Sequence, residues 1–157
     1  MPAPLLNFSL ENAAQNYISG LMTTNGYTGI NYYQGIPNNF SGVISYPCVI
    51  TQCVSQKRSF PNVNLYQAMM NFDYISQIDA PNAFQNHISG ATALSAVLYD
   101  TNSFITALNP PASGVDTRVQ PDIYMYGIVE NEEKPFIAGD GDRRVGQTFS
   151  LRFDCSN

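Results

Sequence analysis

Residues 65–99 read LYQAMMNFDYISQIDAPNAFQNHISGATALSAVLY, and the spacing of the apolar side chains changes halfway along this segment. Up to Ile78 every second residue is apolar, which is the period of a half-buried β-strand. After Pro81 and Asn82, which interrupt this pattern, apolar or small residues recur at steps of three and four, as on one face of an α-helix. We therefore predict a strand that leads through a turn into a helix, and we expect the helix to lie across the apolar face of that strand.

Two details of this segment indicate contacts with other elements. Met69 and Ile75 lie on the otherwise polar side of the strand. Either another subunit covers that side, or it carries two exposed apolar residues, which is common on protein surfaces. Gly90 destabilises a helix by about 1 kcal/mol relative to Ala, so we expect it to permit close packing against a neighbouring element.

A second helix is predicted near the N-terminus. Ser9 is a candidate N-cap, and Asn25-Gly26 is typical of a helix end. The passage 27–42 that follows is rich in Gly, Asn and Tyr, and residues 30–33 form a candidate short strand. The apolar positions of the helix follow the helical period and are Leu10, Ala13, Ala14, Tyr17, Ile18 and Leu21.

The remaining apolar runs predict further strands. The run YPCVITQCV at 46–54 is rich in β-branched residues and is expected to pair as an antiparallel hairpin with the strand at 65–78. Two more strands are predicted at 122–129 (DIYMYGIV) and at 145–155 (VGQTFSLRFDC). This order of elements predicts a single α+β domain over residues 1–157, with long loops and a mostly antiparallel sheet that has two main helices packed on one face.

The segment ENEEKPFIAGDGDRR at 130–144 is predicted to leave the sheet as a projecting C-terminal hairpin arm. Its charges could pair across the two limbs, where an exposed pair contributes about 0–1 kcal/mol. They could instead contact a neighbouring subunit, where opposite charges set the register of docking. The interface candidates are Glu130, Glu132, Glu133, Asp140, Asp142, Arg143 and Arg144.

The composition narrows the class of protein. A net charge of −5 without a basic stripe argues against a nucleic-acid binder. Only 12% of the residues are charged, and sixteen Asn with nine Gln supply much of the polarity. This balance either allows surface to be buried against a partner without desolvating many charges, or reflects compositional drift. No run approaches a membrane span or a signal peptide, so we expect synthesis in the cytoplasm and no membrane partner.

No catalytic residue, cofactor or metal site is predicted. Cys48 and Cys53 are separated by an odd offset on one strand and should point to opposite faces, which does not suit zinc. The three cysteines are expected to be free thiols. His87 could pair with a nucleophilic cysteine, but a buried histidine that bonds a neighbouring strand or loop is favoured. Asp140-Gly141-Asp142 lacks the other ligands of a calcium loop and is more simply a turn.

The order of these elements resembles a known family. An N-terminal amphipathic helix precedes a Pro-started strand (YPCVIT), an alternating strand that carries an Asp, a helix that carries a His, and a closing pair of strands. This pattern resembles the tail terminator, or tail completion, proteins of long-tailed bacteriophages. It covers most of the chain and is strongest at 121–155, although no single motif is diagnostic. The passage 27–42 departs from a compact member of that family.

The resemblance implies a structural virion protein, made in the host cytoplasm, that acts at the head–tail junction. Such subunits form a homo-oligomeric ring, commonly hexameric, that ends the tail tube and joins it to the head. The implied partners are the tail tube protein and a head-side connector protein of the neck, and DNA passes through the lumen without specific binding. Two alternatives remain: a head–tail stopper or adaptor, and a small cysteine hydrolase that uses Cys48 or Cys155.

Overall fold

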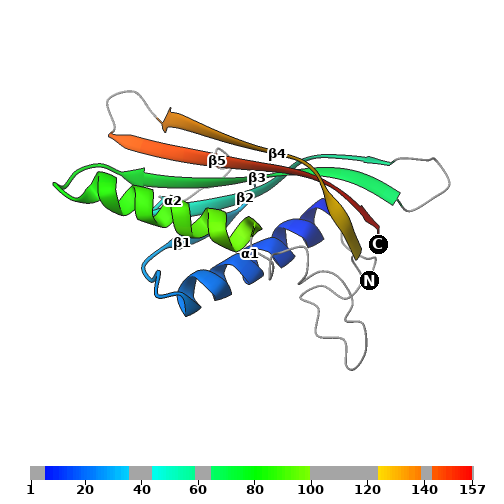
Figure 1. The fold of residues 1–157 in the computed structure, drawn as a ribbon, viewed down its shortest axis with the longest axis horizontal. Coiled ribbons are helices and arrows are strands. Elements are labelled where there is room, and N and C mark those ends of the chain that lie inside the picture. Colours follow the sequence, from blue (N-terminus) through cyan, green and yellow to red (C-terminus); the bar gives the residue numbers. More distant parts are fainter. Residues whose placement is uncertain (1–5, 36–43, 59–64, 100–123, 139–142, 157) are drawn as a thin grey trace.

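The computed structural model describes residues 6–35, 44–58, 65–99, 124–138 and 143–156. Within these residues the strands form one sheet in the order β1-β2-β3-β5-β4, in which β1 and β2 are parallel and all other neighbours are antiparallel (Figure 1). The predicted α+β fold with a mostly antiparallel sheet is confirmed. The elements, in chain order, are α1 (Leu6–Thr24), β1 (Asn31–Gln34), β2 (Cys48–Arg58), β3 (Leu65–Gln77), α2 (Ala83–Tyr99), β4 (Tyr124–Ala138) and β5 (Arg144–Ser156).

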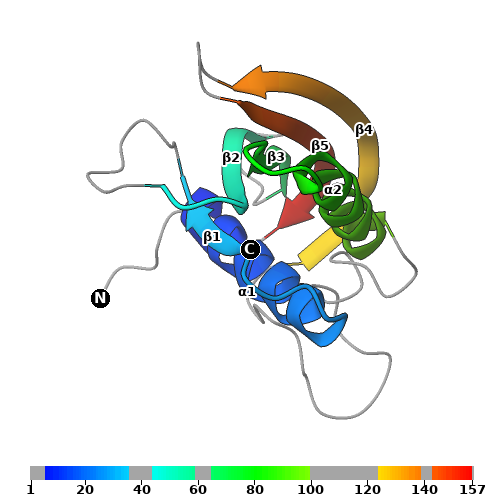
Figure 2. The same cartoon turned by 90° about the vertical axis from the view of Figure 1, so that its left-hand side faces the viewer.

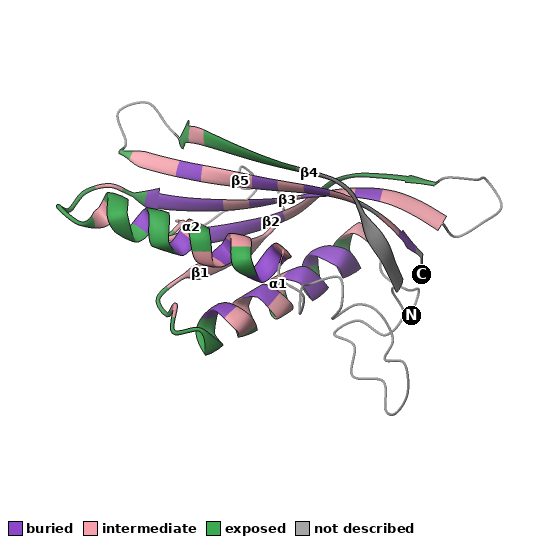
Figure 3. Cartoon of the chain, viewed as in Figure 1, coloured by how far each residue is buried: buried purple, intermediate pink, exposed green. Residues whose placement is uncertain are grey.

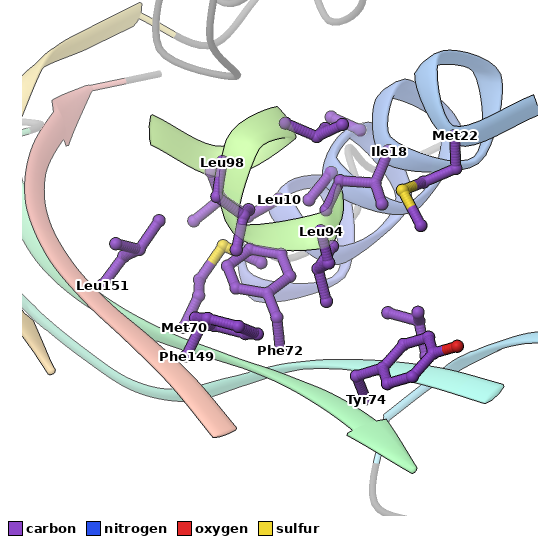
Figure 4. Close-up of a cluster of buried hydrophobic side chains, with 14 of the residues drawn as sticks. Leu10, Ile18, Met22, Met70, Phe72, Tyr74, Leu94, Leu98, Phe149 and Leu151 are labelled. Atoms are coloured by element: carbon purple, nitrogen blue, oxygen red, sulfur yellow. The ribbon is translucent and has the colours of Figure 1, made fainter. Parts of the chain in front are cut away.

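Both helices pack on the same side of the sheet, which curves around them (Figure 2). We call this side the helix face and the opposite side the outer face. The main core lies between the helix face and the two helices, and Figure 4 shows its side chains pointing toward one another. The predicted packing of α2 across β3 is therefore confirmed. The largest fully buried side chains are Leu10, Ile18, Met22, Ile50, Met70, Phe72, Leu94 and Leu98.

The sequence predicted the end of α1 correctly but not its start. The helix already begins at Leu6, so Ser9 is a buried residue of its first turn and not the predicted N-cap. The predicted end is confirmed. The amide of Tyr27 donates to the carbonyl of Met22 at 2.9 Å, that of Gly26 donates to Thr23 at 3.0 Å, and Gly26 has a φ of +88°. This is a Schellman motif, in which Gly adopts the left-handed conformation without strain.

Gly90 allows α2 to approach β3 closely, as expected. A Cβ atom built at Gly90 would collide with the hydroxyl and the ring of Tyr74. Tyr74 is buried and belongs to the main core. Gly90 thus lowers the intrinsic stability of the helix, but it allows the helix backbone to contact a tyrosine of the central strand.

The predicted arm at 130–144 requires a correction. The expected hairpin is present, but residues 130–138 are the second half of β4 and remain paired with β5 as the edge of the sheet. Gln147 faces Pro135, and the hairpin ends where Arg144 faces Ala138. Glu, Lys and Pro are rare in central strands but are tolerated at sheet edges, where they discourage aggregation. For this reason a stretch predicted to project from the sheet as an arm is instead its edge strand.

Buried and exposed residues are distributed unevenly over the sheet and the helices (Figure 3). The buried residues of both helices face the sheet, whereas β4 is exposed from Glu132 to Pro135 and again at Ile137. A second, smaller cluster lies on the outer face and contains Ile75 with Cys48 and Ile50. Ile75 is therefore covered by this chain itself, and its burial requires no second subunit. Partly buried side chains around this cluster are Tyr33, Ile44, Tyr46 and Phe136.

Candidate functional site

The strand register separates the interface candidates that the sequence suggested. Glu132 faces Ser150 and Glu133 faces Phe149, whereas Arg144 faces Ala138 at the other end of the hairpin. Six residues of strand, about 20 Å, therefore separate Glu132 from the position opposite Arg144. Glu132 and Glu133 on β4 therefore cannot pair with Arg144 on β5, as was considered for a hairpin arm. Asp140 and Asp142 lie outside the described residues.

The interface candidates also differ in their exposure and in the face of the sheet on which they lie. Glu132, Glu133 and Arg143 are exposed, and Arg144 is half-buried. Glu130 is placed opposite Arg152 by the register. Because successive residues of a strand point to opposite faces, Glu132 lies on the outer face and Glu133 on the helix face. The exposed half of β4 thus presents charge on both sides of the sheet edge.

Arg144 contacts the chain segment that enters β2. Its Nη1 donates a hydrogen bond to the hydroxyl of Tyr46 at 2.7 Å, and the guanidinium carbon lies 5.4 Å from the centre of the Tyr46 ring. A cation over an aromatic ring and a charge-assisted hydrogen bond both favour this placement. Arg144 therefore has a structural role that ties the start of β5 to residue 46.

Polar side chains pair across β3 and β5 on the outer face. Thr148 donates to the carboxylate of Asp73 at 2.6 Å, and Ser150 donates to the side-chain carbonyl of Asn71 at 2.7 Å. Burial raises the pKa of the Asp73 carboxyl above its ordinary 3.8, and the bond from Thr148 partly counters this. Alternating polar residues are visible in the sequence, but which of them meet depends on the register. Hydrogen bonds between side chains therefore satisfy part of the polar surface of the outer face.

Ser76 and Tyr74 of β3 both contact His87 under α2. His87 Nδ1 is 2.9 Å from Ser76 Oγ, and the centre of its ring is 5.4 Å from that of Tyr74. His87 is 7% exposed, and burial lowers its pKa below the ordinary 6.5, so it is neutral at pH 7. The prediction of a buried histidine bonded to a neighbouring strand is confirmed. These three side chains line a cavity of about 260 Å³, which is also lined by Tyr46 and Asp79.

The cysteines have the properties of core residues. Cys48 lies in the outer-face cluster and Cys53 packs against the main core, so the two point to opposite faces as predicted. Burial raises the pKa of Cys48 and Cys155 to about 12 and that of Cys53 to about 11. All three are free thiols. In the part of the chain that the structure describes, no group of three or more metal-binding side chains comes together.

Sequence reasoning missed the buried carboxylate of Glu11. This residue is only 3% exposed, accepts the backbone N–H of Cys53 at 2.9 Å and accepts the side-chain amide of Gln34 at 3.3 Å. It joins α1 to β1 and β2, next to the irregular register at Cys53 and Ser55. A signal was present, because Glu11 lies at i and i+3 spacing with Ala14 on the apolar stripe of the helix.

Together, the fold and these sites define an α+β domain with helices on one face and a polar outer face that ends in an exposed edge strand. No helix among the described residues is long and apolar enough to span a membrane. Comparison with models of known protein families finds no match for this chain. A search of curated proteins finds no matching relative.

Proposed function

We propose that the chain is a structural virion subunit of the tail terminator type, which forms a ring at the head–tail junction of a long-tailed bacteriophage. The observation that carries the proposal is the one-sided packing of the sheet. Among the described elements, both helices lie on the helix face, and the outer face and the edge of β4 are left for contacts with other chains. The order of the elements, on which the resemblance to tail terminator proteins rests, is consistent with the proposal.

A ring needs two different surfaces on each subunit, one that meets the preceding copy and one that meets the next. The β4 edge is suited to be one of them. Ile137 is 82% exposed there and lies within a stretch that also exposes Glu133 and Lys134. A single apolar residue among charges of both signs can supply contact area while the charges disfavour wrong partners. The outer face next to this edge carries Glu132 and Lys134, so charges of both signs are available there to orient a neighbour.

The same proposal assigns the partners. The ring, with six copies as is common in such a family, would contact the tail tube protein on one side and a head-side connector on the other. DNA would pass through the lumen without specific binding, because the subunit has a net charge of −5 and only seven Lys and Arg residues. Counterion release, which drives nucleic-acid binding, needs clustered basic side chains.

The cysteine hydrolase alternative is disfavoured by the thiols themselves. A nucleophilic cysteine needs a lowered pKa, whereas burial raises the pKa of both Cys48 and Cys155 to about 12. The imidazole of His87 bonds to Ser76 instead of a thiol. The stopper or adaptor alternative shares the ring and differs only in the partner that the ring binds.

Negative-stain electron microscopy of the purified protein tests the proposal. We expect rings with an open centre in the protein alone, and capped tube ends after mixing with purified tail tubes. Tail tubes without the protein are the control. Rings that bind heads but not tubes would assign the stopper role, and a protein that stays monomeric and leaves the tube ends bare would contradict the proposal.

A further inference from the structure

The cavity at the C-terminal end of β3 has no role in the proposed ring. It lies where residues 46–47, the end of β3 and the first turns of α2 meet. Its volume of about 260 Å³ is below the roughly 300–1,000 Å³ of pockets for drug-sized ligands. The space suits one long side chain or a molecule of that size.

The walls of the cavity offer hydrogen-bond acceptors and one carboxylate. Asp79 is the charged residue of the lining, and it is exposed and forms no hydrogen bond or ion pair within the described residues. Gln77 and Asn86 add side-chain amides, and Tyr74, Ser76 and His87 form one wall. Because burial keeps His87 neutral at pH 7, the cavity has a negative charge and no positive charge of its own.

Two aromatic rings and an apolar rim complete the site. Tyr46 and Tyr74 both line the cavity. Arg144 is held on the Tyr46 ring and its hydroxyl and is not part of the lining. Arg143 does not line the cavity either, although its backbone carbonyl accepts the N–H of Ile78, next to Asp79. Next to the cavity, α2 exposes Phe84, whose side chain is 56% exposed and stacks on His87 with 6.4 Å between ring centres.

We propose that this cavity binds an alkylguanidinium or alkylammonium group, carried by an Arg or Lys side chain of a partner protein. The cationic head pairs with Asp79 and the amide oxygens, and the alkyl stem lies against the tyrosine rings, which attract cations and apolar chains alike. Phe84 provides an apolar contact for the residues that flank the basic side chain. This inference rests on the cavity alone and is independent of ring formation.

The test is an NMR titration of the ¹⁵N-labelled protein with N-acetyl-arginine N-methylamide, which carries the side chain without free terminal charges. We expect shifts at the amide of Asn86 and the imidazole of His87, with a dissociation constant on the order of 1–10 mM, as for a ligand with few atoms. The variant Asp79→Asn should weaken binding about fivefold or more, because it removes the charge and keeps the shape. The matched control Glu133→Gln removes an exposed carboxylate on β4 and should leave binding unchanged.

Three further probes make the assignment specific. The lysine analogue should also bind, whereas N-acetyl-aspartate N-methylamide should not, because Asp79 repels it. Free arginine tests whether the cationic group belongs to a polypeptide or to a free metabolite. If free arginine binds no more tightly than the blocked analogue, the ligand is a polypeptide side chain. If it binds much more tightly, the ligand is a free metabolite, and the proposal of a partner protein is overturned. Shifts caused by the anionic probe, or equal binding by wild type and Asp79→Asn, would overturn the proposed site.

Discussion

Single buried polar residues connect the helices of this fold to its sheet. Glu11 holds α1 on β2 through the backbone amide of Cys53, and His87 holds α2 on β3 through Ser76. Each bond satisfies a group that would otherwise be buried without a partner, a situation that costs about 1–3 kcal/mol. Neither side chain belongs to an exposed cluster of charges. Polar residues on the apolar stripe of a helix therefore mark its docking points in this protein.

His87 should make the stability of the protein depend on pH. Its pKa is lowered in the folded state, so between 6.5 and that lower value the unfolded chain binds more protons. The free energy of unfolding should therefore fall as the pH drops through this window, by at most about 1.4 kcal/mol per pH unit. Urea unfolding at about pH 7 and about pH 5.5 measures the effect.

The control for this prediction is His87→Gln, which keeps a polar side chain and removes the titration. Since the chain has one His, the variant should lose most of the pH dependence in this window. Asp73 contributes with the opposite sign at lower pH, because burial raises its pKa above 3.8 and protonation then favours the folded state. An unchanged pH dependence in His87→Gln would show that His87 is not the cause.

At the scale of elements, the contact between α2 and β3 depends on Gly90. Gly90→Ala should destabilise the protein by about 1–3 kcal/mol, because the added methyl collides with Tyr74 and outweighs the gain of about 1 kcal/mol in helix propensity. Gly20 in α1 is the matched control, since a Cβ there meets nothing within 4 Å. Gly20→Ala should stabilise by about 0.4–1 kcal/mol.

Thermal and urea unfolding of both variants measures this difference in sign. Combining Gly90→Ala with Tyr74→Phe should recover part of the loss, because the hydroxyl of Tyr74 is the atom nearest to the added methyl. If Gly90→Ala were as stable as Gly20→Ala, the helix would have room to move, and the close packing of α2 on β3 would be refuted.

At the scale of the whole molecule, the sequence was sufficient for what depends on periodicity. Apolar spacing predicted both helices, the packing of α2 on β3 and the pairing of β2 with β3. It failed for the second half of β4, because Glu132, Glu133 and Pro135 favour an arm outside the sheet unless the strand is known to be an edge. Which side chains contact Asp73 and His87 depends on the strand register and on how α2 packs on the sheet. Local sequence patterns do not determine either of these.

The edge of β4 is where the proposed assembly can be tested without disturbing the core. Ile137 is 82% exposed, so Ile137→Glu should leave the thermal midpoint nearly unchanged. In a ring that buries this residue, the variant loses an apolar contact of about 1.5–3 kcal/mol and adds a charge to a stretch that already contains Glu133. We therefore expect assembly to weaken about tenfold or more, as measured by sedimentation velocity over a range of concentrations. Phe8→Glu on α1 is the matched control, because that side chain is 53% exposed and the carbonyl of Phe8 accepts a hydrogen bond from Gln34 of β1, at the opposite edge of the sheet. Equal weakening in both variants would indicate a general effect of charge, and wild-type assembly of Ile137→Glu would exclude the β4 edge as the subunit contact.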